Sequence, residues 1–139
     1  MTVIVLVAKK KGRYSGNTMY HDKVIADTAL TIDNAAYATA QDRLYDVKGL
    51  EEIWAQFENT GANSIDMTIE KTHKEFTDIA DLVDADFEDE VAEAPIAAAA
   101  KSIAFTKTQL TPEITALRFR FKETTPASPG AVKAEMGLT

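Results

Sequence analysis

The sequence predicts an all-β protein, an antiparallel β-sandwich of jelly-roll-like type. Two regions, 53–69 and 114–122, contain stretches that alternate apolar and polar residues with the period of two that a half-buried strand requires. Other short apolar runs are separated by turn residues and show no regular strand–helix alternation, which favours a sandwich or barrel. We therefore expect a β-sandwich domain over 23–124, an extended N-terminal arm over 1–22 and a C-terminal tail over 125–139.

Composition narrows the classes of function. The 139 residues suffice for one domain, and 45% of them are hydrophobic. Fifteen basic against twenty-two acidic residues give a net charge of −7, which disfavours nucleic-acid binding. The absence of cysteine excludes thiolate metal sites and a cysteine nucleophile, and two histidines leave little room for histidine chemistry. A non-enzymatic binding or structural protein without cofactor or metal is the expectation.

The longest apolar run, residues 3–8, lies near the N-terminus and is mostly β-branched. It is too short to span a membrane, and its basic residues follow the run instead of preceding it as in a signal peptide. Two interpretations stay open: a buried strand of the domain, or an arm that adds a strand to a neighbouring subunit. In the second, the partner-binding residues would be Val3, Val5, Val7, Lys9, Lys10, Lys11 and Arg13.

Between 23 and 49 the signals are weaker. Residues 24–32 have strand-like content, and 35–43 are alanine-rich and could form a short helix. A brief strand is expected over 44–47, ended by Lys48 and Gly49.

The strongest alternation predicts a β-hairpin. Its strands would lie at 53–58 and 65–70, joined by the loop 59–63 with Gly61 at a position of positive φ. A second antiparallel pair is expected from 103–107 and 114–122.

In the second pair the apolar Leu117, Phe119 and Phe121 face one side. The other side carries a basic stripe, which consists of Arg118, Arg120 and Lys122. Single-stranded nucleic-acid binders place exposed aromatic residues among such cations, and here the aromatic residues face away. We therefore expect the stripe to complement an acidic surface, either on this protein or on a neighbouring copy.

The obvious acidic candidate is residues 75–93, with nine acidic residues and no basic one. The spacing of Phe76, Ile79 and Leu82 indicates a short helix or a decorated connection, ended by Pro95. An EF-hand loop counted from Asp84 lacks the required glycine and glutamate, so a solvated acidic face is the default and a looser calcium site a minor alternative.

Trp54 alternates with Gln56 and Glu58 and so shares the polar side of its strand. An outward tryptophan is a frequent interface or ligand anchor, whereas a covered face would make it part of the core. Both interpretations stay open. His21 and His73 lie in no ligand-type spacing and are expected to be surface or packing residues.

Two segments carry a resemblance to a known group of proteins. One is Tyr45-Asp46-Val47-Lys48-Gly49-Leu50-Glu51-Glu52-Ile53-Trp54-Ala55-Gln56-Phe57-Glu58-Asn59-Thr60-Gly61, and the other is Thr111-Pro112-Glu113-Ile114-Thr115-Ala116-Leu117-Arg118-Phe119-Arg120-Phe121-Lys122. With them, residues 23–124 resemble small β-sandwich structural proteins of tailed-phage virions. The resemblance implies a non-enzymatic head decoration, cement or accessory protein of the virion, assembled in the host cytoplasm, which binds the major capsid protein, other virion proteins or copies of itself.

Two alternatives stay open beside this expectation. One is a carbohydrate- or ligand-binding sandwich that uses Trp54 as its platform. The other is a filament subunit that donates its N-terminal strand. Neither calls for a nucleic-acid or membrane partner.

Overall fold

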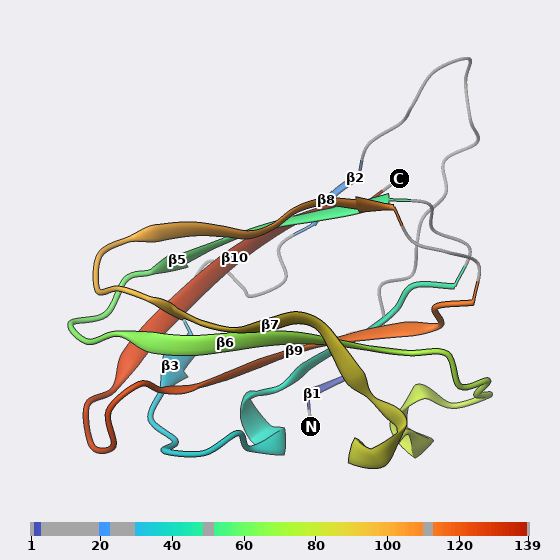
Figure 1. The fold of residues 1–139 in the computed structure, drawn as a ribbon, viewed down its shortest axis with the longest axis horizontal. Helices are drawn as coiled ribbons and strands as arrows, with labels where there is room; N and C mark the ends of the chain where they lie inside the picture. Colours follow the sequence, from blue (N-terminus) through green and yellow to red (C-terminus); the bar gives the residue numbers. More distant parts are fainter. Residues whose placement is uncertain (1, 4–19, 23–29, 49–51, 110–112, 139) are drawn as a thin grey trace.

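The computed structural model describes residues 2–3, 20–22, 30–48, 52–109 and 113–138, which form two five-stranded β-sheets packed face to face (Figure 1). Sheet 1 has the order β1 (Thr2–Val3), β4 (Arg43–Asp46), β9 (Ala116–Glu123), β6 (Ile65–Thr72) and β7 (Glu88–Ile96). Sheet 2 has the order β2 (Tyr20–Asp22), β10 (Gly130–Leu138), β5 (Glu52–Asn59) and β8 (Lys101–Gln109), with β3 (Leu30–Ile32) also paired to β10. The predicted β-sandwich is confirmed.

The order of the strands is that of a jelly roll. From β3 to β10 every connection passes from one sheet to the other, except that between β6 and β7. Four strands of sheet 2, in the order β3–β10–β5–β8, therefore face four strands of sheet 1, in the order β4–β9–β6–β7. This arrangement is that of two Greek keys, as in a jelly roll. All described strand pairs are antiparallel, apart from the parallel pair of β1 and β4.

The alternation in the sequence correctly identifies the side chains of the core. Phe57 of sheet 2 packs against Phe119 and Phe121 of sheet 1, with ring centroids 5.6 and 6.0 Å apart. Tyr45 meets Phe119 edge to face at 5.5 Å. The buried core also contains Ile32, Val47, Ile65, Met67, Ile69, Ile96, Ile114, Leu117 and Val132.

Both predicted hairpins are wrong. β5 pairs with β8 and β10, whereas β6 pairs with β7 and β9, so the loop after Asn59 crosses from sheet 2 to sheet 1. The strands over 103–107 and 114–122 likewise belong to different sheets, as β8 and β9. The physical reason is that alternation marks which side of a strand is apolar, and two strands across a core show it as clearly as two adjacent strands.

Asn59 holds the crossing in place. Its side chain is fully buried, and Nδ2 donates to the carbonyl oxygens of Asn63 (2.7 Å) and Ile96 (3.0 Å). Its Oδ1 accepts from the backbone N–H of Gly61 (2.9 Å) and of Ala131 (3.4 Å). We name Asn59 and these four partners the Asn59 cluster. It joins the β5–β6 connection to the end of β7 and the start of β10.

Gly61 serves this junction through its small size, and the predicted positive φ is wrong. A Cβ on Gly61 would lie 2.6 Å from the nitrogen of Ala131 and 2.7 Å from the Cα of Gly130. A Cβ on Gly130 would lie 2.5 Å from Cγ2 of Ile65. Glycine is required because the backbone of β10 approaches the β5–β6 connection so closely.

The acidic stretch contains no α-helix. Residues of the predicted helix form two 3₁₀ turns, η2 (Ile79–Asp81) and η3 (Asp84–Asp86), and the rest forms the edge strand β7. Pro95 lies inside β7 instead of ending a helix, which an edge strand tolerates because its outer N–H groups need no partner in the sheet. The helix considered over 35–43 is reduced to one 3₁₀ turn, η1 (Thr39–Gln41).

The C-terminal residues also differ from the sequence-based expectation. Residues 130–138, predicted as part of a tail because of the preceding Pro- and Ser-containing segment, form β10 in the interior of sheet 2. The segment 124–129 is the turn between β9 and β10, with Ala127 at φ 62°. At the other terminus, two parts of the predicted arm are described. β1 pairs with β4, and β2 pairs with β10, both within the same chain.

Candidate functional site

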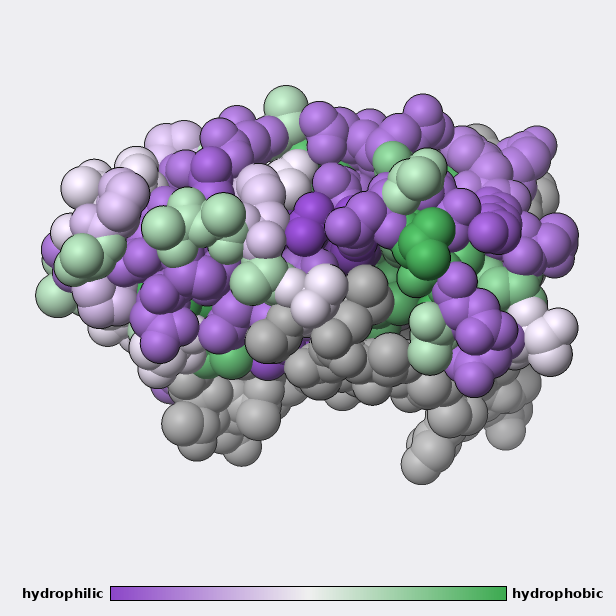
Figure 2. Space-filling view, turned by 90° about the horizontal axis from the view of Figure 1, so that it is seen from below, coloured by the Kyte–Doolittle hydropathy of each residue, from purple (hydrophilic) through white to green (hydrophobic). Residues whose placement is uncertain are grey.

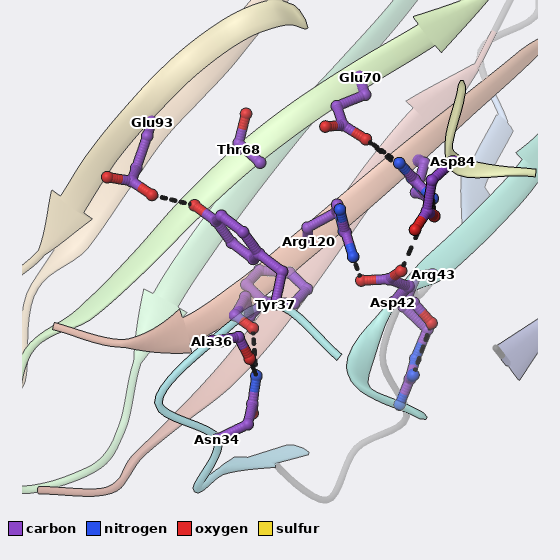
Figure 3. A network of polar contacts seen from close by, with 12 residues as sticks. Asn34, Ala36, Tyr37, Asp42, Arg43, Thr68, Glu70, Asp84, Glu93 and Arg120 are labelled. Carbon is purple, nitrogen blue, oxygen red and sulfur yellow. Dashed lines mark hydrogen bonds and ion pairs between the residues drawn. The ribbon is translucent and has the colours of Figure 1, made fainter. Parts of the chain in front are cut away.

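The basic stripe lies on the outer face of sheet 1, under two connections of the same chain. The β3–β4 connection (33–42) and the β6–β7 connection (73–87) both lie on this side of the sandwich, where η1, η2 and η3 are found (Figure 1). Arg118, Arg120 and Lys122 point away from the core, as their alternation with Phe119 and Phe121 predicts. The stripe therefore contacts both covers. Figure 3 shows Arg120 beside Asp42 and Tyr37 of the β3–β4 connection.

Arg118 is the centre of the arrangement and is 1% exposed. Its Nε donates to Oε1 of Glu70 (2.8 Å), and Nη2 donates to the same oxygen. Its Nη1 donates to Oδ1 of Asp84 (2.5 Å) and lies 4.0 Å from Oδ2 of Asp42. The guanidinium also stacks over the ring of Phe87 at 4.1 Å. We name these five residues the Arg118 cluster.

The Arg118 cluster joins three elements. Glu70 comes from β6, Asp84 from the β6–β7 connection and Asp42 from the β3–β4 connection. A planar guanidinium with five donors suits this geometry, because it binds several carboxylates in fixed directions. One buried cation thus holds the β6–β7 cover by hydrogen bonding and lies within ion-pair distance of the β3–β4 cover.

Arg120 continues the stripe and binds Asp42 directly. Its Nε donates to Oδ1 of Asp42 at 3.0 Å, and its guanidinium lies 5.1 Å from the ring of Tyr37. Asp42 is fully buried, and burial raises the pKa of its carboxyl although Arg120 and Arg118 lower it. Among the described residues, Oδ2 of Asp42 has no hydrogen-bond partner.

Lys122 and Tyr37 meet at Glu93 of β7. The hydroxyl of Tyr37 donates to Oε1 of Glu93 at 2.5 Å, and Nζ of Lys122 lies 3.1 Å from the same oxygen. The Tyr37 hydrogen bond, followed by that of Lys122, lowers the pKa of the Glu93 carboxyl. Burial and the neighbouring Glu93 raise the pKa of Tyr37. The ring of Tyr37 thus ties the β3–β4 connection to the far edge of the sheet.

A second apolar cluster lies beneath the β6–β7 connection. It contains Leu44, Ile79, Leu82 and Ala116, with Phe76 and Phe87 packed against it. Ile79 and Leu82 are residues whose spacing indicated a helix. Ile79 begins the 3₁₀ turn η2, Leu82 directly follows that turn, and both side chains are buried in this cluster. Seen from this side, the described surface is mostly hydrophilic with a strongly hydrophobic spot (Figure 2), and Val83 of the connection is 56% exposed.

The stripe was expected to face an acidic surface either on this protein or on a neighbouring copy, and the structure shows an acidic surface of the same chain. Asp84 and Glu93 belong to the acidic stretch 75–93 and bind Arg118 and Lys122. Sequence reasoning missed Glu70 and Asp42. Glu70 lies opposite Arg118 in the β6–β9 register, but this pairing could not be known before β6 and β9 were recognised as neighbours.

The other predicted partner-binding residues are only partly described. Val3 is in β1, and Trp54 is in β5 opposite Gly137 of β10. For these two residues only the backbone is described. Val5, Val7, Lys9, Lys10, Lys11 and Arg13 lie outside the described residues altogether. Their proposed role in partner binding stays a prediction.

The described residues contain no group of three or more histidine, aspartate or glutamate side chains placed to hold a metal ion. His73 is exposed, and its Nδ1 lies 3.5 Å from Glu88. Within the same part of the chain, no helix has the length and apolar character needed to cross a membrane.

Comparison with protein-family models and with curated protein sequences gives no match. Among solved structures, the chain is similar to one described as infectious bursal disease virus Gx strain, with a TM-score of 0.46 and 12% identity over 87% of this chain and 31% of that one. It is also similar to the infectious bursal disease virus VP2 subviral particle, with a TM-score of 0.41 and 13% identity over 87% and 32% of the two chains. The chain thus spans about a third of the length of these structures, and its assignment as a jelly roll rests on its own strand order.

Proposed function

We propose that this chain is a non-enzymatic structural protein of a virus particle, and that within the particle it is a shell component or a decoration protein bound to the shell. The observation that carries the proposal is the jelly-roll order of its strands, an architecture that viral capsid proteins share with lectins and cupins. This support comes from the fold, and the charged face described above adds to it.

The charged face supports an architectural role. Arg118 and Asp42 are buried, and each ionic group of the stripe already binds a carboxylate of this chain. A catalytic or ligand-binding use of these groups would require the covers to leave. Their present arrangement instead stabilises a thick, two-sided plate, which suits a repeated building block.

The resemblance to tailed-phage virion proteins supports the finer part of the proposal. It involves the strand that ends at the Asn59 cluster and the strand that carries the basic stripe, which are the two positions where the side chains join separate connections. A decoration or cement protein would bind the shell through its remaining surfaces, including those of sheet 2.

Quantitative mass spectrometry of purified virus particles from the source of the sequence tests the proposal. Hundreds of copies per particle are expected for a shell or decoration protein, against a dozen or fewer for a portal or tail part. Absence from particles would overturn the virion assignment. Sedimentation velocity and electron microscopy of the purified chain provide a second test, in which self-assembly or binding to emptied shells is expected.

A carbohydrate-binding sandwich is the outcome to be distinguished, since lectins use the same architecture. A glycan screen with the wild-type chain and Trp54→Ala would reveal it. Binding that Trp54→Ala abolishes, in a chain that stays monomeric and is missing from particles, would replace the proposed function with this one.

A further inference from the structure

The edge of sheet 1 at β4 holds a short strand that is distant in sequence. β4 pairs with β9 on one side and with β1 on the other, where Thr2 lies opposite Arg43 and Val3 opposite Leu44. The β1–β4 pair is parallel, whereas the other strand pairs of the described residues are antiparallel. Arg43 and Leu44 are 9% and 0% exposed. With β1 in place, the edge of β4 is thus occupied, and its residues are covered.

The connection between β1 and the rest of the domain is long. Residues 4–19 separate Val3 from Tyr20 of β2, and a chain of this length spans up to about 55 Å. A domain of this size has a radius of gyration of about 14 Å. Covalent connection therefore does not require that the strand on β4 come from the same copy.

The charge of this connection favours a second copy as the source. Residues 4–19 carry four basic side chains and no acidic one, in a chain of net charge −7. A connection that passes from one copy to the next would place these cations between two otherwise acidic domains and reduce their repulsion.

We propose that in the assembled protein the edge of β4 receives the β1 strand of a neighbouring copy. The inference rests on the proposed function as an assembling shell or decoration protein and names the contact that joins its copies. The exchange replaces the intrachain backbone hydrogen bonds of β1 by identical ones between copies. In a shell the exchange can compete with the intrachain pairing, because neighbouring copies are held at a local concentration comparable with the effective concentration that a long tether gives.

Engineered disulfides test the exchange, because the natural chain has no cysteine. Chains with Thr2→Cys and chains with Arg43→Cys, carrying different tags, are unfolded together, assembled and oxidised. A disulfide-linked dimer that contains both tags, well above the dimers that each variant forms with itself, is expected. The double variant should likewise form linked chains in the assembly.

Two results separate this inference from the proposed function. If the assembly forms but the double variant gives only cross-linked single chains and the mixture no dimer with both tags, the exchange is wrong and the structural role stands. If the wild-type chain neither assembles nor occurs in particles, the proposed function fails and the exchange with it.

A backbone variant covers the case that Arg43→Cys does not fold. Val3→Pro removes the N–H of a β1 residue, while its matched control Val3→Ala keeps it. Val3→Pro is expected to keep the circular dichroism spectrum of the folded domain and to reduce assembly at least tenfold, with Val3→Ala close to wild type. Equal assembly by Val3→Pro and Val3→Ala would overturn the exchange.

Discussion

The Arg118 cluster and the Asn59 cluster both hold separate segments of the fold together, but with different chemistry. Each uses one buried polar side chain to join three separate segments of the fold. Arg118 does so with a full charge that faces three carboxylates, and Asn59 with a neutral amide that faces backbone groups. The first fixes the covers of sheet 1, and the second fixes a crossing between the sheets.

The difference lies in how completely each cluster satisfies its polar atoms. Asn59 uses its two donor hydrogens and its acceptor oxygen within the fold. The Arg118 cluster retains a buried Asp42 oxygen without a hydrogen-bond partner among the described residues. A neutral, satisfied amide is insensitive to pH, whereas a charged cluster depends on the ionisation of its carboxylates.

Removal of the central cation should have the largest effect. Arg118→Met leaves Glu70 and Asp84 without this cation and leaves the buried Asp42 with Arg120 alone, and should lower the free energy of unfolding by about 3–5 kcal/mol at pH 7. Urea denaturation measures the loss. Lys122→Met, at the more exposed end of the stripe, should cost about 1 kcal/mol or less. Equal losses for the two variants would show that the burial of Arg118 has no special role.

Removal of the amide should have the next largest effect. Asn59→Ala leaves the carbonyls of Asn63 and Ile96 and the N–H of Gly61 without this partner, and should cost about 2–4 kcal/mol. The same urea experiment at pH 4 and at pH 7 should give the same loss, unlike Arg118→Met, whose loss should shrink at the lower pH. The matched control is Asn63→Ala, whose single bond to the Pro129 carbonyl should be worth about 1 kcal/mol. A pH-dependent loss for Asn59→Ala would remove the distinction between the clusters.

A substitution at Gly61, where the β5–β6 connection approaches the backbone of β10, should lower stability by a smaller amount. Gly61→Ala places a Cβ 2.6 Å from the nitrogen of Ala131, so the two segments must move apart, at a cost of about 1–3 kcal/mol. Thermal unfolding followed by circular dichroism measures it. Ala62→Ser, at the exposed neighbouring position, should change stability by less than about 0.5 kcal/mol. A Gly61→Ala variant as stable as wild type would show that the loop adapts freely.

The smallest effect is expected at the edge of the charged face. Tyr37→Phe removes the hydrogen bond that most lowers the pKa of Glu93, so this pKa should rise toward its usual value of 4.5. Because the folded-state pKa is lowered, the stabilisation is present above pH 4.5 and is lost as pH falls through the lowered value. At pH 7 the variant should be less stable by about 0.5–1 kcal/mol, since Glu93 is half exposed. A carbon-13 titration of the Glu93 carboxyl that matches wild type would contradict this account.

The sequence was most informative where a local pattern reports a local property. The alternation of Leu117, Phe119 and Phe121 with three cations correctly separated core from outer face, and the spacing of Ile79 and Leu82 correctly marked a buried side. The same patterns misassigned the secondary structure or the partner. Ile79 lies in a 3₁₀ turn and Leu82 directly after it, and the strand that ends at Asn59 pairs with β8 and β10 instead of β6.

The sequence by itself determined that this protein is a β-sandwich without cysteine chemistry, and which side of its main strands is apolar. Only the tertiary structure decided which strands are neighbours in the jelly-roll order, that residues 130–138 lie in sheet 2 and that Arg118 is buried among Glu70, Asp84 and Asp42. The reason is physical. Alternation depends on the period of two within one strand, whereas strand pairing and ion pairing depend on where each connection leads.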